Sequence, residues 1–209
     1  MKLAILPLMM ALPFIATKAA LAAGPDPLVS IQSRWAVCQY ESKDSEHQIF
    51  CFENLIKKTQ RALKKDPNRP ELIVWLAINK ASLAGADGGL GALSLAKEAK
   101  VLLEQVIDKA PETLNGSAYT SLGSLYYKVP GWPIGFGDDD MAEKMLRKAL
   151  ELNPDGIDPN YFYADFLIQD GREKEAMSYL SKAKNAPPRA DRPLADFGRQ
   201  QEIAKLLGK

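Results

Sequence analysis

The side chains that could carry catalytic chemistry are few and scattered. The one histidine of the chain, His47, lies beside a polar turn and has no second metal ligand or nucleophile at a useful spacing. The sequence contains no nucleophile elbow, no glycine-rich phosphate loop at a strand-to-helix junction and no zinc-type cysteine spacing. We therefore expect an exposed histidine, no catalytic site and no cofactor, so this protein is expected not to be an enzyme.

Three consecutive carboxylates, Asp138, Asp139 and Asp140, offer two kinds of chemistry. Clustered carboxylates attract hard divalent cations, but these three lack the alternating ligand spacing of a calcium loop. They stand directly before a segment with helical apolar spacing, where carboxylates cap the first backbone N–H groups and complement the helix dipole. We expect capping here and no metal site, with cation binding as the alternative.

The two cysteines, Cys38 and Cys51, are the remaining reactive side chains. If one helix ends near Tyr40 and the next begins near His47, the two thiols lie at similar distances from the turn and could face each other. An oxidising compartment would then allow a disulfide, worth on the order of 3 kcal/mol for a loop of this size. Two buried thiols in a core are the alternative.

The first 22 residues have the features of an export signal. Lys2 is followed by an apolar run over residues 3–16 and by small residues that end at Ala22. This pattern predicts a secretory signal peptide, cleaved after Ala22, and hence a periplasmic protein. An uncleaved membrane anchor is the alternative, but Pro7 and Pro13 interrupt a run that is shorter than the roughly 20 residues of a spanning helix.

The charge balance after cleavage disfavours several classes of partner. Removing Lys2 and Lys18 leaves 25 basic side chains against 26 acidic ones, with both signs interspersed. Neither nucleic acid nor an anionic membrane surface is therefore an expected partner. Beyond the signal, the sequence has no apolar stretch long enough to span a bilayer, so the mature protein is not expected to be membrane-spanning.

A repeat of 34 residues organises the elements that would position these side chains. Four positions of the segment 141–154 recur at this offset, with the small, bulky, small and proline residues of a packed helix: Ala142, Leu146, Ala149 and Pro154 recur as Ala176, Leu180, Ala183 and Pro188. Such self-similarity is typical of stacked helical hairpins.

The spacing of apolar residues and prolines indicates that helical hairpins continue over the whole mature chain, 23–209. We expect this chain to be one domain. We expect helix pairs at about 28–66, 70–110, 114–153 and 158–186, with Asp158 capping the fourth pair and Pro159 at its first helical position. A last helix, at about 193–207, would cover the open end of the stack with an apolar face made by Leu194, Phe197, Ala204 and Leu207.

The third pair contains an insertion that does not have a helical pattern. Trp132, Ile134 and Phe136 are large apolar residues set among prolines and glycines. They must either pack onto the helices or be presented to a partner. Because exposed apolar surface is costly unless it is used, we expect them to pack.

The third pair also carries the features of a known family. Its first helix has an aromatic, Leu, Gly, Tyr pattern at Tyr119, Leu122, Gly123 and Tyr126, and with the 34-residue period it resembles the tetratricopeptide repeat (TPR). The resemblance implies an all-α, TPR-like solenoid of helical hairpins, about four pairs plus a C-terminal capping helix. It also implies a concave ligand-binding groove, and mapping the inward-facing positions of the family onto this chain gives Trp75, Asn79, Thr120, Ser124, Tyr127, Lys128, Tyr161, Asp165 and Gln169.

A narrower resemblance covers the insertion and the helix after it, LYYKVPGWPIGFGDDDMAEKMLRKALELNPDG. This segment resembles the periplasmic T component of tripartite ATP-independent transporters, which would imply a protein that works beside a solute-binding protein. We therefore expect an exported scaffold that engages a protein or peptide through its concave groove. An accessory protein that handles a small apolar solute, with Trp132 and Phe136 at the cavity mouth, is the alternative.

Overall fold

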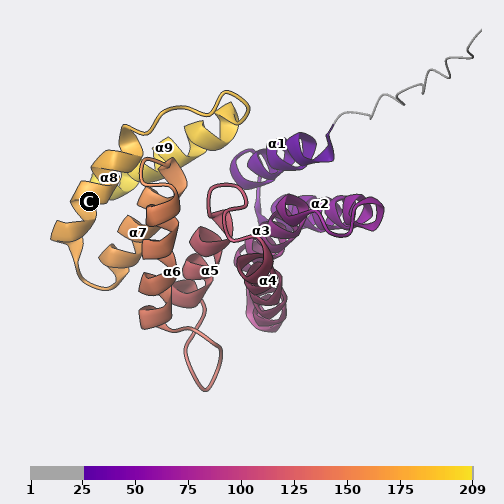
Figure 1. Ribbon diagram of the computed structural model, residues 1–209, viewed down its shortest axis with the longest axis horizontal. Helices are drawn as coiled ribbons and strands as arrows, with labels where there is room; N and C mark the ends of the chain where they lie inside the picture. Colours follow the sequence, from indigo (N-terminus) through magenta and orange to yellow (C-terminus); the bar gives the residue numbers. More distant parts are fainter. Residues whose placement is uncertain (1–25, 209) are drawn as a thin grey trace, which may run out of the picture.

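The computed structural model describes residues 26–208, which fold into α-helices joined by short connections (Figure 1). In chain order the helices are α1 (Pro27–Tyr40), α2 (Ser45–Lys65), α3 (Pro70–Asp87), α4 (Gly89–Lys109), α5 (Ser117–Lys128), α6 (Asp139–Leu152), α7 (Ile157–Gln169), α8 (Glu173–Lys184) and α9 (Pro193–Leu207). This confirms the predicted all-α fold of four helix pairs and a final helix. The predicted signal peptide, residues 1–22, lies outside the described residues.

The helix ends follow local sequence chemistry. The side chains of Asp26, Asp44 and Asp138 accept hydrogen bonds from backbone N–H groups in the first turns of α1, α2 and α6. Asp138 is therefore a cap, as predicted. Lys64 and Lys65 end α2, where cations stabilise the negative end of the helix dipole.

Small residues allow the two helices of a pair to approach closely. Ala142, Leu146 and Ala149 of α6 are fully buried, and so are the corresponding residues of α8. In α5, a Cβ added at Gly123 would lie 2.6 Å from Leu146 Cγ and 3.2 Å from the Ala142 carbonyl oxygen. A larger residue would separate α5 from α6, which explains the glycine in a helix interior.

The first helices of the pairs form a closed ring with α9. Contacts run from α1 to α3, α3 to α5, α5 to α7, α7 to α9 and back from α9 to α1. Figure 1 shows the N-terminal end of α9 beside α1. At this junction a Cβ on Gly198 would lie 2.5 Å from ring atoms of Tyr40, so α9 and α1 are in close contact. The last helix thus connects both ends of the stack.

The predicted apolar face of α9 is partly wrong. Phe197 is 62% exposed and Ala204 is exposed, whereas Asp196 and Arg199 are buried beside Ala195 and Ile203. The physical reason is that α9 packs against α1, α7 and α8, and buries ion pairs as well as apolar side chains. A single apolar face therefore does not predict which residues are buried in a helix that packs against several neighbours.

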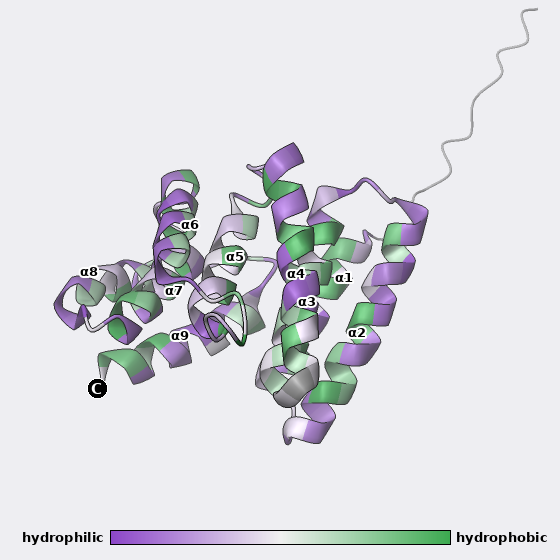
Figure 2. Ribbon diagram, turned by 90° about the horizontal axis from the view of Figure 1, so that it is seen from below, coloured by the Kyte–Doolittle hydropathy of each residue, from purple (hydrophilic) through white to green (hydrophobic). Residues whose placement is uncertain are grey.

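The buried apolar residues form two clusters. One is formed by α1, α2 and α3 together with Ala195 of α9, and the other extends from α3 to α9. Figure 2 shows hydrophobic and hydrophilic residues alternating along α2, the pattern of a helix with one buried face. Among the described residues, no helix is both long and apolar enough to cross a membrane.

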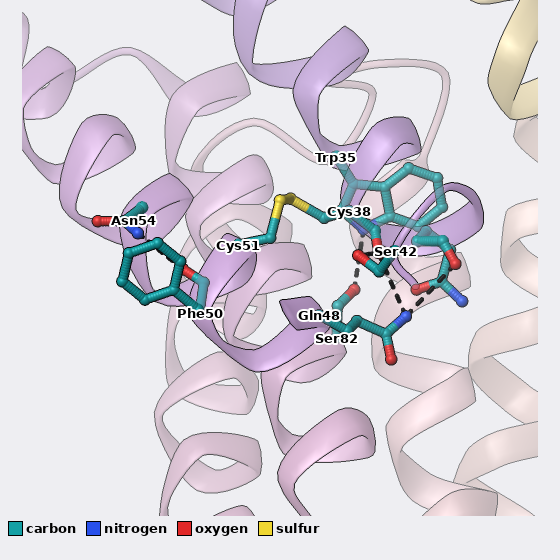
Figure 3. Close-up of a disulfide and its surroundings, with 9 residues drawn as sticks. Trp35, Cys38, Ser42, Gln48, Phe50, Cys51, Asn54 and Ser82 are labelled. Atoms are coloured by element: carbon teal, nitrogen blue, oxygen red, sulfur yellow. Dashed lines mark hydrogen bonds between the residues drawn. A yellow bond between two sulfur atoms is a disulfide. The ribbon is translucent and has the colours of Figure 1, made fainter. Parts of the chain in front are cut away.

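Cys38 and Cys51 are joined by a disulfide that links α1 to α2 (Figure 3). Both residues are buried in the cluster that these helices share. Ser42 and Gln48, from the turn region between the two helices, donate hydrogen bonds to the Cys38 carbonyl oxygen. The predicted facing arrangement across the turn is the one observed.

Candidate binding cavity

The ring of helices surrounds a cavity of about 770 Å³ that is partly open to solvent. Its lining comes from α1, α3, α5, α7 and α9, from the segments just before α5 and α7, and from the segment that joins α8 to α9. The second helices of the pairs, α2, α4, α6 and α8, lie outside this lining apart from Gln48. Residues more than 160 positions apart in sequence, such as Gln32 and Arg199, therefore meet at one site.

Aromatic side chains from α1, α3 and α7 contribute to the cavity wall. Trp35 and Tyr40 come from α1, Trp75 from α3, and Tyr161 and Phe162 from α7. The Trp35 ring lies edge-on to Trp75, with 6.0 Å between ring centroids, and its Nε1–H donates to Ser82 Oγ at 2.9 Å (Figure 3). This wall offers apolar, polarisable contact surface to a ligand.

Ion pairs beside the α7 rings close the ring of helices: the Arg199 guanidinium carbon lies 4.2 Å from the Tyr161 ring centroid and 4.6 Å from that of Phe162. Asp158 accepts hydrogen bonds from Arg189 Nη1 at 2.6 Å and from Arg199 Nε at 3.0 Å, and Arg199 also pairs with Glu202. Burial raises the pKa of the Asp158 carboxyl, but the two guanidinium groups outweigh it and hold the pKa well below its ordinary value. Asp158 is therefore ionised and fixes both arginines.

The predicted cap at Asp158 is wrong. Helix α7 begins one residue earlier, at Ile157, with Gly156 as its N-cap, so Asp158 lies inside the first turn and Pro159 is the third helical residue. Its carboxylate faces the arginines of α9 and of the segment before it. The local pattern could not show these partners, which are more than 30 residues away.

Arg192 differs from its neighbouring arginines. Its guanidinium carbon lies 5.0 Å from the Trp75 ring centroid, and within residues 26–208 no carboxylate forms an ion pair with it. Two buried donor atoms here, Arg192 Nε and Trp75 Nε1, have no hydrogen-bond partner among the described residues. Burial and the nearby Arg189 charge lower the pKa of the Arg192 guanidinium.

Five of the predicted groove residues line the cavity: Trp75, Thr120, Ser124, Lys128 and Tyr161. Three of the five lie on α5, and one lies on each of α3 and α7. Of these five, Trp75, Thr120 and Tyr161 are largely buried within the wall, and Lys128 is exposed at its edge.

The other four predicted groove residues do not line the cavity. Asn79 is fully buried between helices, where its Nδ2 donates to Thr59 Oγ1 of α2 at 3.1 Å. Tyr127 donates to Asp165 Oδ2 at 2.8 Å, and Lys128 pairs with the same oxygen at 3.0 Å. These contacts join α5 to α7, so Tyr127 and Asp165 hold the ring together, whereas Gln169 is exposed at the end of α7.

Several cavity residues were not identified from the sequence, namely Trp35, Tyr40, Arg189, Arg192 and Arg199. All five depend on the contact between the first and last helices of the described chain. The sequence carries only a weak signal for them, because Arg189 and Arg192 lie before the predicted last helix, 193–207, and Arg199 within it fits a surface cation equally well.

The insertion between α5 and α6 divides into a packed base and an exposed tip. Phe136 packs against Tyr126, with 5.9 Å between ring centroids, as predicted. The same prediction is wrong for Trp132 and Ile134, which are 90% and 68% exposed. The Gly137 N–H donates to the Pro130 carbonyl oxygen, and this contact closes the base of the loop so that its tip projects from the helices (Figure 1).

The remaining polar candidates lie away from the cavity. His47 is exposed, and its Nδ1 lies 2.8 Å from Asp44 Oδ1. Among residues 26–208, no group of three or more His, Cys, Asp or Glu side chains is arranged to hold a metal ion.

Comparison with known proteins agrees with the repeat architecture. Residues 136–195, which span α6, α7 and α8, match the tetratricopeptide repeat family. Among solved structures, a thermophilic TPR protein of Thermus thermophilus is similar at 21% sequence identity and a TM-score of 0.42, over 87% of this chain and 100% of that one. A search of curated proteins found no match. The predicted TPR resemblance is thus confirmed for this segment, and the narrower resemblance to T components stays a prediction.

Proposed function

We propose that this protein binds a small ligand in the cavity inside its helical ring and catalyses no reaction. The observation that carries the proposal is the contact of α9 with α1, which turns the concave face of the repeat stack into a cavity. Its volume of about 770 Å³ lies within the range of roughly 300–1,000 Å³ that is typical of small-molecule sites.

The contact of α9 with α1 argues against the open peptide groove that the sequence led us to expect. An extended peptide crossing the concave face would need a trough that is open at both ends, but α9 and the segment before it occupy one side of that face. The cavity therefore favours a small molecule over an extended chain. We propose that its occupant is a small solute, as in the alternative function considered in the sequence analysis.

A protein partner is the second candidate, and the exposed loop tip supports it. Trp132 and Ile134 present apolar surface, and the exposed carboxylates of Asp139 and Asp140 follow the base of the same loop. A matching partner would have an apolar pocket with a basic rim. We propose a solute-binding protein as this partner, in line with the resemblance to T components.

We further propose that the protein acts in the periplasm. The signal-like segment 1–22 and the disulfide between Cys38 and Cys51 both suit an exported protein. Fractionation of cells that express the full chain tests this: the processed protein is expected in the periplasmic fraction, and cytoplasmic accumulation of the unprocessed chain would contradict it.

The cavity proposal is tested by filling the cavity. Ala81 lies in the cavity wall, so Ala81→Trp should occupy the space of the ligand, while Ala204→Trp makes the same change at an exposed position on α9. In a thermal-shift screen of small molecules, compounds that stabilise the wild type and Ala204→Trp should not stabilise folded Ala81→Trp. Equal stabilisation of all three proteins would place the binding site elsewhere.

The loop proposal is tested by site-directed cross-linking in periplasmic extract. A photoreactive residue at position 132 should cross-link a solute-binding protein, whereas the same residue at Phe50, another exposed aromatic position, should not. The same products from both positions would contradict a specific loop partner.

A further inference from the structure

The cavity contains a cation whose charge is not balanced by a direct partner. Four cationic side chains line it: Lys128, Arg189, Arg192 and Arg199. Lys128 pairs with Asp165, and Arg189 and Arg199 share Asp158. Within residues 26–208, Arg192 is the one of the four with no carboxylate in ion-pair contact. A partly buried cation without a partner is costly and favours binding of an anion.

The carboxylates of Asp158, Asp191 and Asp196 favour the charged form of Arg192 through space, but none of them forms an ion pair with it. Asp158 and Glu202 are already engaged by the paired arginines. Asp155 and Asp191 are exposed at the rim, where water screens their charge. Burial raises the pKa of Tyr161 to about 12, so its phenol is neutral and adds no negative charge to the wall.

Trp75 provides a second, independent indication of a missing ligand. The residue is 3% exposed and lines the cavity, yet its buried indole N–H has no acceptor within the described chain. A buried donor normally has a hydrogen-bond partner, and leaving it unpaired costs free energy. Arg192 stacks on the same ring, and its buried Nε also lacks an acceptor. Two unpaired donors and one unpaired charge therefore lie together.

Helix ends add to the positive potential at this site. The N-terminal ends of α5, α7 and α9 all contribute to the lining, through Ser117, Ile157 and Arg192. None of these three helices has a side-chain hydrogen bond at its N-cap. Uncapped helix N-termini carry partial positive charge and accept anions.

We propose that the ligand is a monocarboxylate with an apolar or aromatic body. Its carboxylate pairs with Arg192 and accepts from Trp75 Nε1, and its body lies along the wall formed by Trp35, Tyr161 and Phe162. This inference rests on the proposed cavity function and specifies the chemical class of its ligand.

A carboxylate fits these groups better than a phosphate does. The planar guanidinium fork of arginine matches the two oxygens of a carboxylate. A single unpaired cation balances a single negative charge, whereas a phosphate monoester carries nearly two at neutral pH. The aromatic wall then requires an apolar remainder of the ligand, because burying a second polar group there without a partner would be unfavourable.

The test compares acids with their uncharged analogues. Binding of indole propionate, phenylbutyrate and octanoate, each against its primary amide, is measured by calorimetry on wild type, Arg192→Gln and Arg192→Lys. At least one acid should bind the wild type about 10- to 100-fold more tightly than its amide, and Arg192→Gln should remove this preference. Arg192→Lys should restore it in part, because it keeps the charge but loses the fork. Arg61→Gln, the same charge change on the exposed surface of α2, should leave it intact.

Each other outcome decides against at least one of the two proposals. If acids and amides bind wild type equally and Ala81→Trp abolishes both, the cavity function stands and the carboxylate proposal is overturned. If an acid binds and Ala81→Trp does not weaken it, the site lies outside the cavity and both proposals fail. If no acid binds the folded wild type at millimolar concentration, the carboxylate proposal is also overturned. A Trp75→Phe variant should weaken the preferred acid severalfold while its amide is affected less.

Discussion

At the scale of single residues, closure of the ring depends on one carboxylate. Asp158 of α7 holds Arg199 of α9 and Arg189 of the preceding segment, and Arg199 also lies 4.2 Å from the Tyr161 ring centroid. Because Arg199 is only 7% exposed, its charge needs this partner. The same carboxylate therefore determines the stability of α9 and the shape of the cavity.

We predict that Asp158→Asn destabilises the protein by about 3–5 kcal/mol, because it leaves a buried arginine without its main partner. Urea unfolding followed by circular dichroism measures the change. Asp155→Asn, an exposed carboxylate on the same rim, is the control and should change stability by no more than about 0.5 kcal/mol. Equal effects of the two substitutions would show that the Asp158 network does not hold α9.

A second carboxylate, Glu143, should make the free energy of unfolding depend on pH in the acidic range. Its hydrogen bond from Arg172, with further bonds from Arg147 and Tyr163, outweighs desolvation and lowers its pKa from 4.5 to about 2. A carboxyl with a lower pKa in the folded state stabilises the protein above the unfolded pKa, and this contribution is lost as pH falls through the folded pKa. Unfolding free energy should therefore decrease between about pH 4.5 and pH 2, and Glu143→Gln should flatten that decrease. An unchanged slope in the variant would contradict this assignment.

At the scale of elements, the contact between α1 and α9 can be tested through glycine. A Cβ at Gly198 would lie 2.5 Å from Tyr40 ring atoms, whereas a Cβ at Gly85 of α3 would have no atom within 4 Å. Gly198→Ala should destabilise the protein by about 1–3 kcal/mol through overpacking. Gly85→Ala should stabilise it by up to about 1 kcal/mol through helix propensity. Thermal unfolding of both variants measures the difference, and a stabilising Gly198→Ala would argue against close packing of α9 on α1.

The pairing of α1 with α2 should depend on the disulfide. The exported protein should show no free thiol until it is reduced, and reduction should lower its stability by about 3 kcal/mol, given the sequence separation of 13 between Cys38 and Cys51. Thiol titration before and after reduction, followed by urea unfolding, gives both quantities. Two reactive thiols after denaturation alone would refute the pairing in the mature protein.

At the scale of the whole molecule, predictability from sequence follows the range of the contacts. The helix pairs follow from short-range patterns, because small residues such as Ala142 and Gly123 repeat wherever two helices cross. The ring does not, because contacts such as Tyr40 with Gly198 join positions that no repeat relates. The same distinction explains Asn79, which was predicted to face the groove but whose buried partner Thr59 lies on another helix.

The site was predictable to a similar degree. Thr120 and Ser124 follow from the inward phase of α5 in the repeat. Arg192 does not, because its importance comes from a missing partner, which is visible only once the surrounding carboxylates have been placed. A cation that looks like surface charge in the sequence is the most informative residue of the cavity.

The central claim is that one ligand contacts the first helix of the described chain, α1, and Arg192 at the start of its last helix, α9, at the same time. Hydrogen exchange with and without the monocarboxylate that binds most tightly tests it directly. Binding should slow amide exchange together in α1, the second half of α3, the start of α7 and residues 189–199, and should leave the tip of the loop at Trp132 unchanged. Protection confined to α5 and α7, with none in α1 and α9, would indicate an open groove and contradict the closed ring as the binding site.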